Sequence, residues 1–243
     1  MNTETHQGHG HWIVPAVLTV FFAATVFPFD GVISKSMKDF QLAPDLRSEL
    51  EALQQYGALS TMVVGIAIIW LVDPERRRRL LDWLAAAALT SLTCTAVKIC
   101  IGRPRPKFDD PATFLGLWDT YPLTLKAGVT VLRHSWELVG RQPWDLWSMP
   151  SSHTALAAVM SVFLVALYPR LRPFGIVMVV LVGSCRVLFR EHYPTDVIVG
   201  AAVGQLIARQ VITACWGTRV LDWVWLKREG SRARQEMIPA STE

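Results

Sequence analysis

The chain has 243 residues, of which 51% are hydrophobic and only 18% are charged. Soluble domains carry about 25% charged residues, so this composition favours a membrane protein over a soluble one. The formal net charge is +4, but the basic residues lie mostly in loops and tails, where they set membrane topology. We therefore expect no nucleic-acid partner. The four cysteines form no CxxC pair, which indicates neither a disulfide framework nor a zinc site.

Apolar segments of about 17–25 residues are long enough to cross a bilayer. The chain contains six candidates: Trp12–Phe29, Tyr56–Val72, Leu81–Ile101, His153–Tyr168, Pro173–Phe189 and Val197–Trp216. A soluble protein could bury some of them in its core, but six in one chain favour a polytopic membrane protein of the all-α class. We expect one membrane domain over residues 1–226 and a polar cytoplasmic tail over residues 227–243.

Six crossings would place both termini on the same side of the membrane. The short loop between the second and third segments holds four consecutive arginines, Arg76–Arg79. Basic residues in short loops mark the cytoplasmic side, so both termini are predicted to be cytoplasmic. Loops 30–55, 102–152 and 190–196 then lie on the periplasmic or extracellular side. The absence of eukaryotic targeting motifs fits a bacterial inner membrane.

Two of the outer loops carry apolar patterns of their own. In the first loop, Leu46, Leu50 and Leu53 recur at helical spacing among acidic residues, which predicts a short interfacial helix. The second loop is rich in tryptophan, with Trp118, Trp136, Trp144 and Trp147. Tryptophan favours the headgroup layer, so this loop either rests against the membrane or uses these rings in ordinary packing.

Ionisable residues inside apolar segments are costly and are candidates for function. Lys98 and Arg186 lie in the last turns of the third and fifth segments, which both run outward. The fourth and sixth segments begin at that same face. The topology thus gathers a set of polar residues in one outer layer: Lys98, Arg105, His153, Arg186, His192 and Asp196.

Such a cluster suits a phosphate group. Arginine donates paired hydrogen bonds to phosphate, while Ser151, Ser152 and the N–H groups at the start of the fourth segment could bind the same anion. His192 and Asp196 are four residues apart, and a carboxylate beside a histidine activates its imidazole as a nucleophile. Separately, each residue has a structural alternative, since long cations can extend to the interface and a serine can cap a helix.

These residues resemble the signature of the type 2 phosphatidic acid phosphatase superfamily, which has three ordered motifs. K-x6-R-P is matched by Lys98 through Arg105-Pro106, whereas Arg103 is out of register. P-S-G-H is matched by Pro150–His153, with Ser152 in place of glycine. S-R-x5-H-x3-D is matched by Arg186, His192 and Asp196, with Cys185 in place of serine. We expect activity to survive both departures.

The resemblance implies a metal-independent membrane lipid phosphatase with no cofactor. In that mechanism His192 attacks phosphorus, Asp196 orients His192, and His153 protonates the leaving oxygen and then activates water. The phosphoryl oxygens are implied to bind a second set of groups: Lys98, Arg105, Ser151, Ser152 and Arg186. A rate that falls in both acid and base is expected, because one histidine must be neutral and the other protonated.

Several alternatives remain open at this point. Family relatives act on undecaprenyl pyrophosphate, phosphatidylglycerol phosphate, phosphatidic acid or lipid A, and the residues do not select among these lipids. A lipid phosphotransferase would use the same site. A non-catalytic phosphate-binding transporter would need the cations but not two histidines. The sequence gives no indication of oligomeric state.

Overall fold

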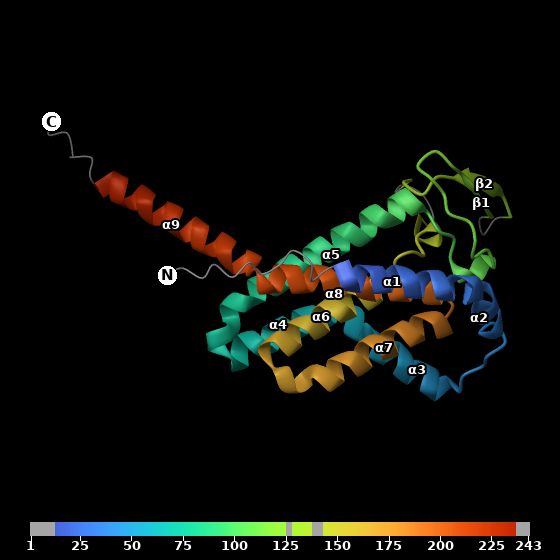
Figure 1. The fold of residues 1–243 in the computed structure, drawn as a ribbon, viewed down its shortest axis with the longest axis horizontal. Helices are drawn as coiled ribbons and strands as arrows, with labels where there is room; N and C mark the ends of the chain where they lie inside the picture. Colours follow the sequence, from blue (N-terminus) through green and yellow to red (C-terminus); the bar gives the residue numbers. More distant parts are fainter. Residues whose placement is uncertain (1–12, 125–127, 138–142, 237–243) are drawn as a thin grey trace.

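The computed structural model describes residues 13–124, 128–137 and 143–236, with the backbone alone for Pro143 and for residues 228–236. Trp12 and the last seven residues of the predicted tail lie outside the described residues. The described chain forms long helices packed side by side, with α2 and a small β-sheet at one end and α9 projecting from the other (Figure 1).

Each predicted membrane segment corresponds to a helix: α1 (Ile13–Val26), α4 (Leu59–Val72), α5 (Leu80–Ile101), α6 (Ser152–Leu167), α7 (Arg172–Leu188) and α8 (Pro194–Thr213). In the part of the chain that the structure describes, 4 helical stretches are long and apolar enough to cross a membrane, and 5 if the bent pair Pro44–Gly57 and Leu59–Val72 forms one span. The helix α6 is apolar but shorter. The fold is therefore that of a multi-pass membrane protein, and the count of six crossings stays a prediction.

The short helix α6 is central in the bundle. It contacts α5, α7 and α8, and Ala155, Ala157, Val159 and Phe163 are fully buried. Sixteen helical residues reach only about 24 Å, less than the roughly 30 Å of a bilayer core. Because other helices cover α6, its length need not match the thickness of the lipid.

Glycines on α8 allow it to pack closely against α6. A Cβ at Gly200 would lie 2.4 Å from the carbonyl oxygen of Ser151, and one at Gly204 would lie 2.0 Å from that of Ala155. Small residues four positions apart commonly allow two membrane helices to pack closely. This contact presses the start of α8, with Asp196, against the start of α6.

Shorter elements connect the helices: η1 (Phe27–Phe29), α2 (Asp30–Ser36), α3 (Pro44–Leu53), η2 (Gln54–Gly57), η3 (Pro74–Arg79), η4 (Pro106–Phe108), η5 (Pro143–Leu146) and η6 (Pro169–Leu171). The predicted helix in the first outer loop is α3, in which Leu46 is 50% exposed and Leu53 43% exposed. Its placement at the membrane surface remains a prediction.

The all-α expectation missed a small antiparallel sheet in the second outer loop. Strand β1 (Tyr121–Thr124) pairs with β2 (Thr130–Arg133), with Tyr121 opposite Arg133. Four-residue strands are too short to show a clear alternation in sequence. In the same loop the Trp147 indole donates to the Ser135 carbonyl oxygen at 2.8 Å, whereas Trp118 is 87% exposed.

At the end of the bundle away from the sheet, a buried carboxylate on α5 holds the start of the last helix. Asp82 accepts hydrogen bonds from the backbone N–H and the hydroxyl of Thr218, at 3.0 and 2.9 Å, and pairs with Arg79 at 2.9 Å. These contacts hold the first turn of α9 (Trp216–Glu236). Helix α9 continues past Lys227, so the predicted boundary between membrane domain and tail falls inside it.

Candidate active site

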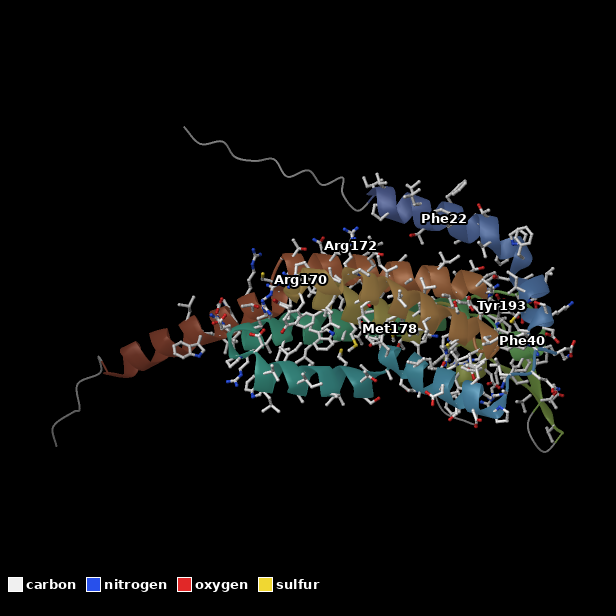
Figure 2. All side chains as sticks on the ribbon, turned by 90° about the horizontal axis from the view of Figure 1, so that it is seen from below. Phe22, Phe40, Arg170, Arg172, Met178 and Tyr193 are labelled. Atoms are coloured by element: carbon white, nitrogen blue, oxygen red, sulfur yellow. The ribbon has the colours of Figure 1, made fainter. Side chains whose placement is uncertain are left out.

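The predicted site residues come from four helix ends that meet at one end of the bundle. Lys98 is in the last turn of α5, and Arg186 is in the last turn of α7. His153 lies in the first turn of α6 and Asp196 in the first turn of α8. Figure 2 labels Tyr193, at the start of α8, near this end of the bundle.

Asp196 is fully buried and forms several hydrogen bonds. Its Oδ1 accepts from the Arg103 guanidinium at 2.6 Å. Its Oδ2 accepts from the Ser148 hydroxyl at 2.6 Å and from the Tyr193 backbone N–H at 2.8 Å. A carboxylate with this many donors is held ionised and in a single orientation.

His192 is oriented chiefly by Ser148. The distance between His192 Nδ1 and Asp196 Oδ2 is 3.8 Å, which is longer than a hydrogen bond. His192 Nδ1 lies 2.6 Å from the carbonyl oxygen of Ser148, and that carbonyl can only accept, so Nδ1 carries the proton. Ser148 thus links the two residues, and Nε2 of the neutral ring keeps its lone pair for attack on an electrophile.

The protonation state of His192 agrees with this tautomer. The pKa of His192 is lowered from 6.5 to about 3, chiefly by burial; Asp196 opposes this shift, and the nearby cations Lys98, Arg186 and Arg105 add to it. The ring is therefore neutral at physiological pH. A neutral imidazole is the form that acts as a nucleophile.

Arg103, which the spacing of the family motif excluded, is joined to the site through Asp196. Its side chain is fully buried between two carboxylates that are also fully buried, with Nη1 2.6 Å from Asp196 and Nη2 2.7 Å from Asp30. The ring of Tyr193 lies 4.3 Å from its guanidinium carbon. Arg103 is therefore a positioning residue that fixes Asp196.

Asp30, at the start of α2, completes this buried network. Besides Arg103, it accepts hydrogen bonds from the backbone N–H of Thr195 at 3.1 Å and from the Thr195 hydroxyl. A lone acidic residue at the end of the first apolar segment could have marked it as a candidate. Its partners could not be inferred, because they lie 73 and 165 positions away in the sequence.

Three cations lie near the two histidines of the site. Lys98 is 6% exposed, and its Nζ donates to the Trp147 carbonyl oxygen at 2.6 Å, which leaves two of its three protons for a ligand. Arg105 donates from Nε to the Trp144 carbonyl oxygen at 2.8 Å. Arg186 keeps a buried Nε without a hydrogen-bond partner among the described residues.

Glu191 occupies the space between the two arginines. Its Oε2 contacts Arg105 Nη1 and lies 3.5 Å from Arg186 Nη2. No sequence motif includes this residue as a site candidate, although it directly precedes His192. The bridge shows that both guanidinium groups are directed at one carboxylate.

Gln54 is a second neighbour of Arg186 that the sequence analysis missed. It is buried in η2, and its Oε1 lies 3.2 Å from Arg186 Nη1. Gly57 makes this placement possible, because a Cβ there would lie 2.1 Å from the carbonyl oxygen of His153. The close approach brings η2 against the start of α6 and therefore close to the site.

The start of α6 offers free backbone donors. The N–H of Ser151 donates to the Asp196 carbonyl oxygen at 3.0 Å, and its hydroxyl pairs with that of Thr154 at 3.0 Å. Ser151 thus supports the site from a fully buried position. The backbone N–H groups of Ser152 and His153 belong to the first turn, which has no intrahelical acceptors, and such groups bind anions.

His153 is near the cations but not bonded to them. Its ring lies within electrostatic range of Arg186, Arg105 and Lys98. No hydrogen bond to the ring is present within the described part of the chain. The ring is therefore available for proton transfer to a bound ligand.

The two departures from the family motif are accommodated by packing. Ser152 lies beside the thiol of Cys94, one turn before Lys98 on α5. Cys185 is 2% exposed, next to Arg186. Within residues 13–124, 128–137 and 143–236, no three His, Cys, Asp or Glu side chains lie close enough together to hold a metal ion.

Comparison with known proteins identifies one matching family and two solved structures with a similar fold. The family model of the PAP2 superfamily matches residues 79–220. Among solved structures, the chain is similar to the first transmembrane PAP2 type phosphatidylglycerolphosphate phosphatase from Bacillus subtilis, with 22% identity and a TM-score of 0.53 over 83% of this chain and 94% of that one. It is also similar to LpxE from Aquifex aeolicus, with 16% identity and a TM-score of 0.50 over 74% and 92%.

No curated protein sequence matches the chain. At these identities the two structural likenesses concern the fold alone. The family match covers more than half of the chain, and it includes all three motifs read from the sequence. The chain therefore belongs to the PAP2 superfamily.

Proposed function

We propose that this protein is a membrane lipid phosphatase that uses His192 as a nucleophile and requires no metal for phosphoryl transfer. The observation that carries the proposal is the geometry of His192. Its Nδ1 is bound to Ser148 at 2.6 Å, so the free Nε2 belongs to a neutral ring with Lys98, Arg105 and Arg186 nearby. A cluster of cations beside a neutral, oriented imidazole is suited to in-line attack on a phosphoryl group.

In the first step Nε2 of His192 attacks phosphorus, and the bond between phosphorus and the lipid oxygen breaks. Protonated His153 gives its proton to that leaving oxygen. In the second step His153 takes a proton from water, the resulting hydroxide attacks phosphorus, and the bond to Nε2 breaks. The products are the dephosphorylated lipid and inorganic phosphate, with both histidines restored.

The cations and the start of α6 stabilise the phosphoryl oxygens during both steps. Glu191, which now bridges Arg105 and Arg186, is displaced when the phosphoryl group binds. The dianion then offsets the positive charge around His153 and favours its protonated form in the complex. The substrate thus helps to prepare the acid that protonates its own leaving group.

Membrane-level placement of the site favours a lipid substrate. The apolar helices run from the site to the far end of the bundle (Figure 1), so the site lies near one membrane face. The solved neighbours include a phosphatidylglycerolphosphate phosphatase and LpxE, and we propose a lipid phosphomonoester or pyrophosphate as substrate. With the arginine-rich η3 and both termini in the cytoplasm, the site faces the periplasm or the cell exterior.

Phosphate release and trapping of the intermediate test this proposal. Wild type, His192→Ala and the control His134→Ala, which changes a half-buried histidine outside the cluster, are purified in detergent with EDTA. The panel is phosphatidic acid, phosphatidylglycerol phosphate, undecaprenyl pyrophosphate, lipid A and glucose 6-phosphate. Wild type and His134→Ala should release phosphate and yield an acid-labile phosphoprotein, while His192→Ala does neither.

The outcomes separate the competing functions. Equal release by His192→Ala would exclude His192 as the nucleophile. A labelled wild type that releases phosphate only when an acceptor lipid is added would indicate a phosphotransferase. Binding of the panel lipids without labelling or release would indicate a phosphate-binding protein and refute the proposal.

A further inference from the structure

A cavity of about 510 Å³ lies between α6, α7 and α8, in the half of the bundle farther from His192. Most of its lining comes from the second half of α6, the first half of α7 and the second half of α8, and it begins at Ala158 on α6 and Ala201 on α8. On each helix the lining residues recur about once per turn, as in Ala158, Val162 and Ala166 of α6 and Ile176 and Val180 of α7. The cavity is thus a groove that runs along the bundle axis.

The dimensions of this groove match one leaflet of a bilayer. Its wall on α8 extends from Ala201 to Thr213, which corresponds to about 18 Å at 1.5 Å per residue. One leaflet contributes about half of the roughly 30 Å hydrocarbon core. Ile176 and Val180 line the groove and are 58% and 62% exposed. The groove is therefore open sideways, towards the surface that faces lipid.

Two arginines line the same groove at its far end. Arg172 begins α7 and Arg209 lies near the end of α8, one turn after Gln205. Figure 2 labels Arg172 at the end of the bundle opposite Tyr193. Among the residues that the structure describes, neither arginine has a hydrogen bond or an ion pair.

Three of the other arginines at this end have carboxylate partners: Arg76 with Asp73, Arg78 with Asp222 and Arg79 with Asp82. Extension of a long side chain to the interface accounts for one basic residue at a helix end. It does not account for two unpaired guanidinium groups and an amide that line one leaflet-length groove. Their common feature is complementarity to a phosphate group with an apolar chain attached.

We propose that this groove binds one anionic phospholipid of the leaflet opposite the candidate active site. One acyl chain lies along α6 and α7, and the phosphate lies between Arg172 and Arg209. Arginine binds phosphate through paired hydrogen bonds, and basic pockets between membrane helices bind anionic headgroups. A zwitterionic phosphatidylcholine carries the same phosphate with a quaternary ammonium beside it, so its net charge is zero and two arginines attract it less strongly.

Lipid retention in native mass spectrometry tests this inference. The protein is purified in detergent, delipidated, and mixed with phosphatidylglycerol or phosphatidylcholine that carry the same acyl chains. Wild type should retain one phosphatidylglycerol with a preference of about tenfold or more, since two basic residues contribute. The double variant Arg172→Gln/Arg209→Gln should lose this preference, whereas Arg170→Gln, an exposed arginine outside the groove, should keep it.

Two further variants separate the groove from the active site. Ala166→Phe adds bulk at an exposed lining position and should reduce retention of both lipids. His192→Ala should retain phosphatidylglycerol as wild type does, because the groove lies at the other end of the bundle. Equal retention of the two lipids by wild type, or an equal loss in Arg170→Gln and in the double variant Arg172→Gln/Arg209→Gln, would overturn the inference. Loss in His192→Ala would place the lipid in the active site instead.

Discussion

Exchange of Arg103 for glutamine should destabilise the protein far more than the same exchange at Arg105. Arg103 is fully buried between the fully buried Asp30 and Asp196, so Arg103→Gln leaves two carboxylates without their cation. Removal of one partner from a buried ion pair costs roughly 3–5 kcal/mol. Arg105 is 17% exposed and pairs with a half-exposed carboxylate, so Arg105→Gln should reduce activity with a much smaller loss of stability.

A double-mutant cycle measures this coupling. In Asp30→Asn one carboxylate is neutral, so adding Arg103→Gln to it leaves only Asp196 as an uncompensated buried charge. The double variant should therefore be less destabilised than the sum of the two single variants, by about 1–3 kcal/mol. The assay is reversible unfolding in mixed micelles, followed by tryptophan fluorescence for wild type, both single variants and the double variant. Additivity within about 0.5 kcal/mol, or equal destabilisation by Arg105→Gln, would refute the reasoning.

Three other results are expected. Glu191→Gln frees the two arginines that it bridges and should lower the KM for a phosphate substrate by up to about fivefold, as expected for a partly exposed pair; an unchanged or higher KM would count against displacement of this carboxylate. Ser148→Ala keeps the carbonyl that binds His192 but removes a hydrogen bond to Asp196, so kcat should fall by about tenfold or more, with little change in KM; a wild-type kcat would exclude that link. His192 binds a proton near pH 6.5 in the unfolded chain and only near pH 3 in the folded one. The unfolded state therefore binds more protons between these values, and the free energy of unfolding should fall as pH drops through this window, by at most about 1.4 kcal/mol per unit. The same titration of His192→Gln should show a shallower slope, and an identical slope would contradict the low pKa.

The membrane segments could be predicted because hydrophobic runs determine helices directly. Lys98 and Arg186 could then be placed at one face, since alternating helix directions bring their ends together. The motif spacing, by contrast, indicated Arg105 and excluded Arg103. It could not show the role of Arg103, because spacing along one segment carries no information about a carboxylate 73 positions earlier. Recognising the role of Arg103 required the tertiary contact with Asp30.

The remaining differences have local physical causes. The β1–β2 pair was not predicted because its strands have only four residues each. The role of Ser148 was not predicted because a single serine next to the tryptophan-rich loop forms no recognisable motif. The orientation of His192 depends on a backbone carbonyl, which any residue supplies. For that reason sequence alone led to a direct His192–Asp196 pair, whereas the structure places Ser148 between them.

The buried position of Asp30 has a consequence for the order in which the protein assembles. Helix α1 has no buried residues of its own, and Asp30, directly after it, binds Arg103 and Thr195, which lie 73 and 165 positions later in the chain. Helix α1 therefore leaves the ribosome before the residues that bind Asp30 at its end have been synthesised. Until Thr195 has been synthesised, the Asp30 carboxylate lacks two of its hydrogen-bond donors in the protein. The polar network behind Asp196 can thus close only when nearly all of the bundle has been synthesised.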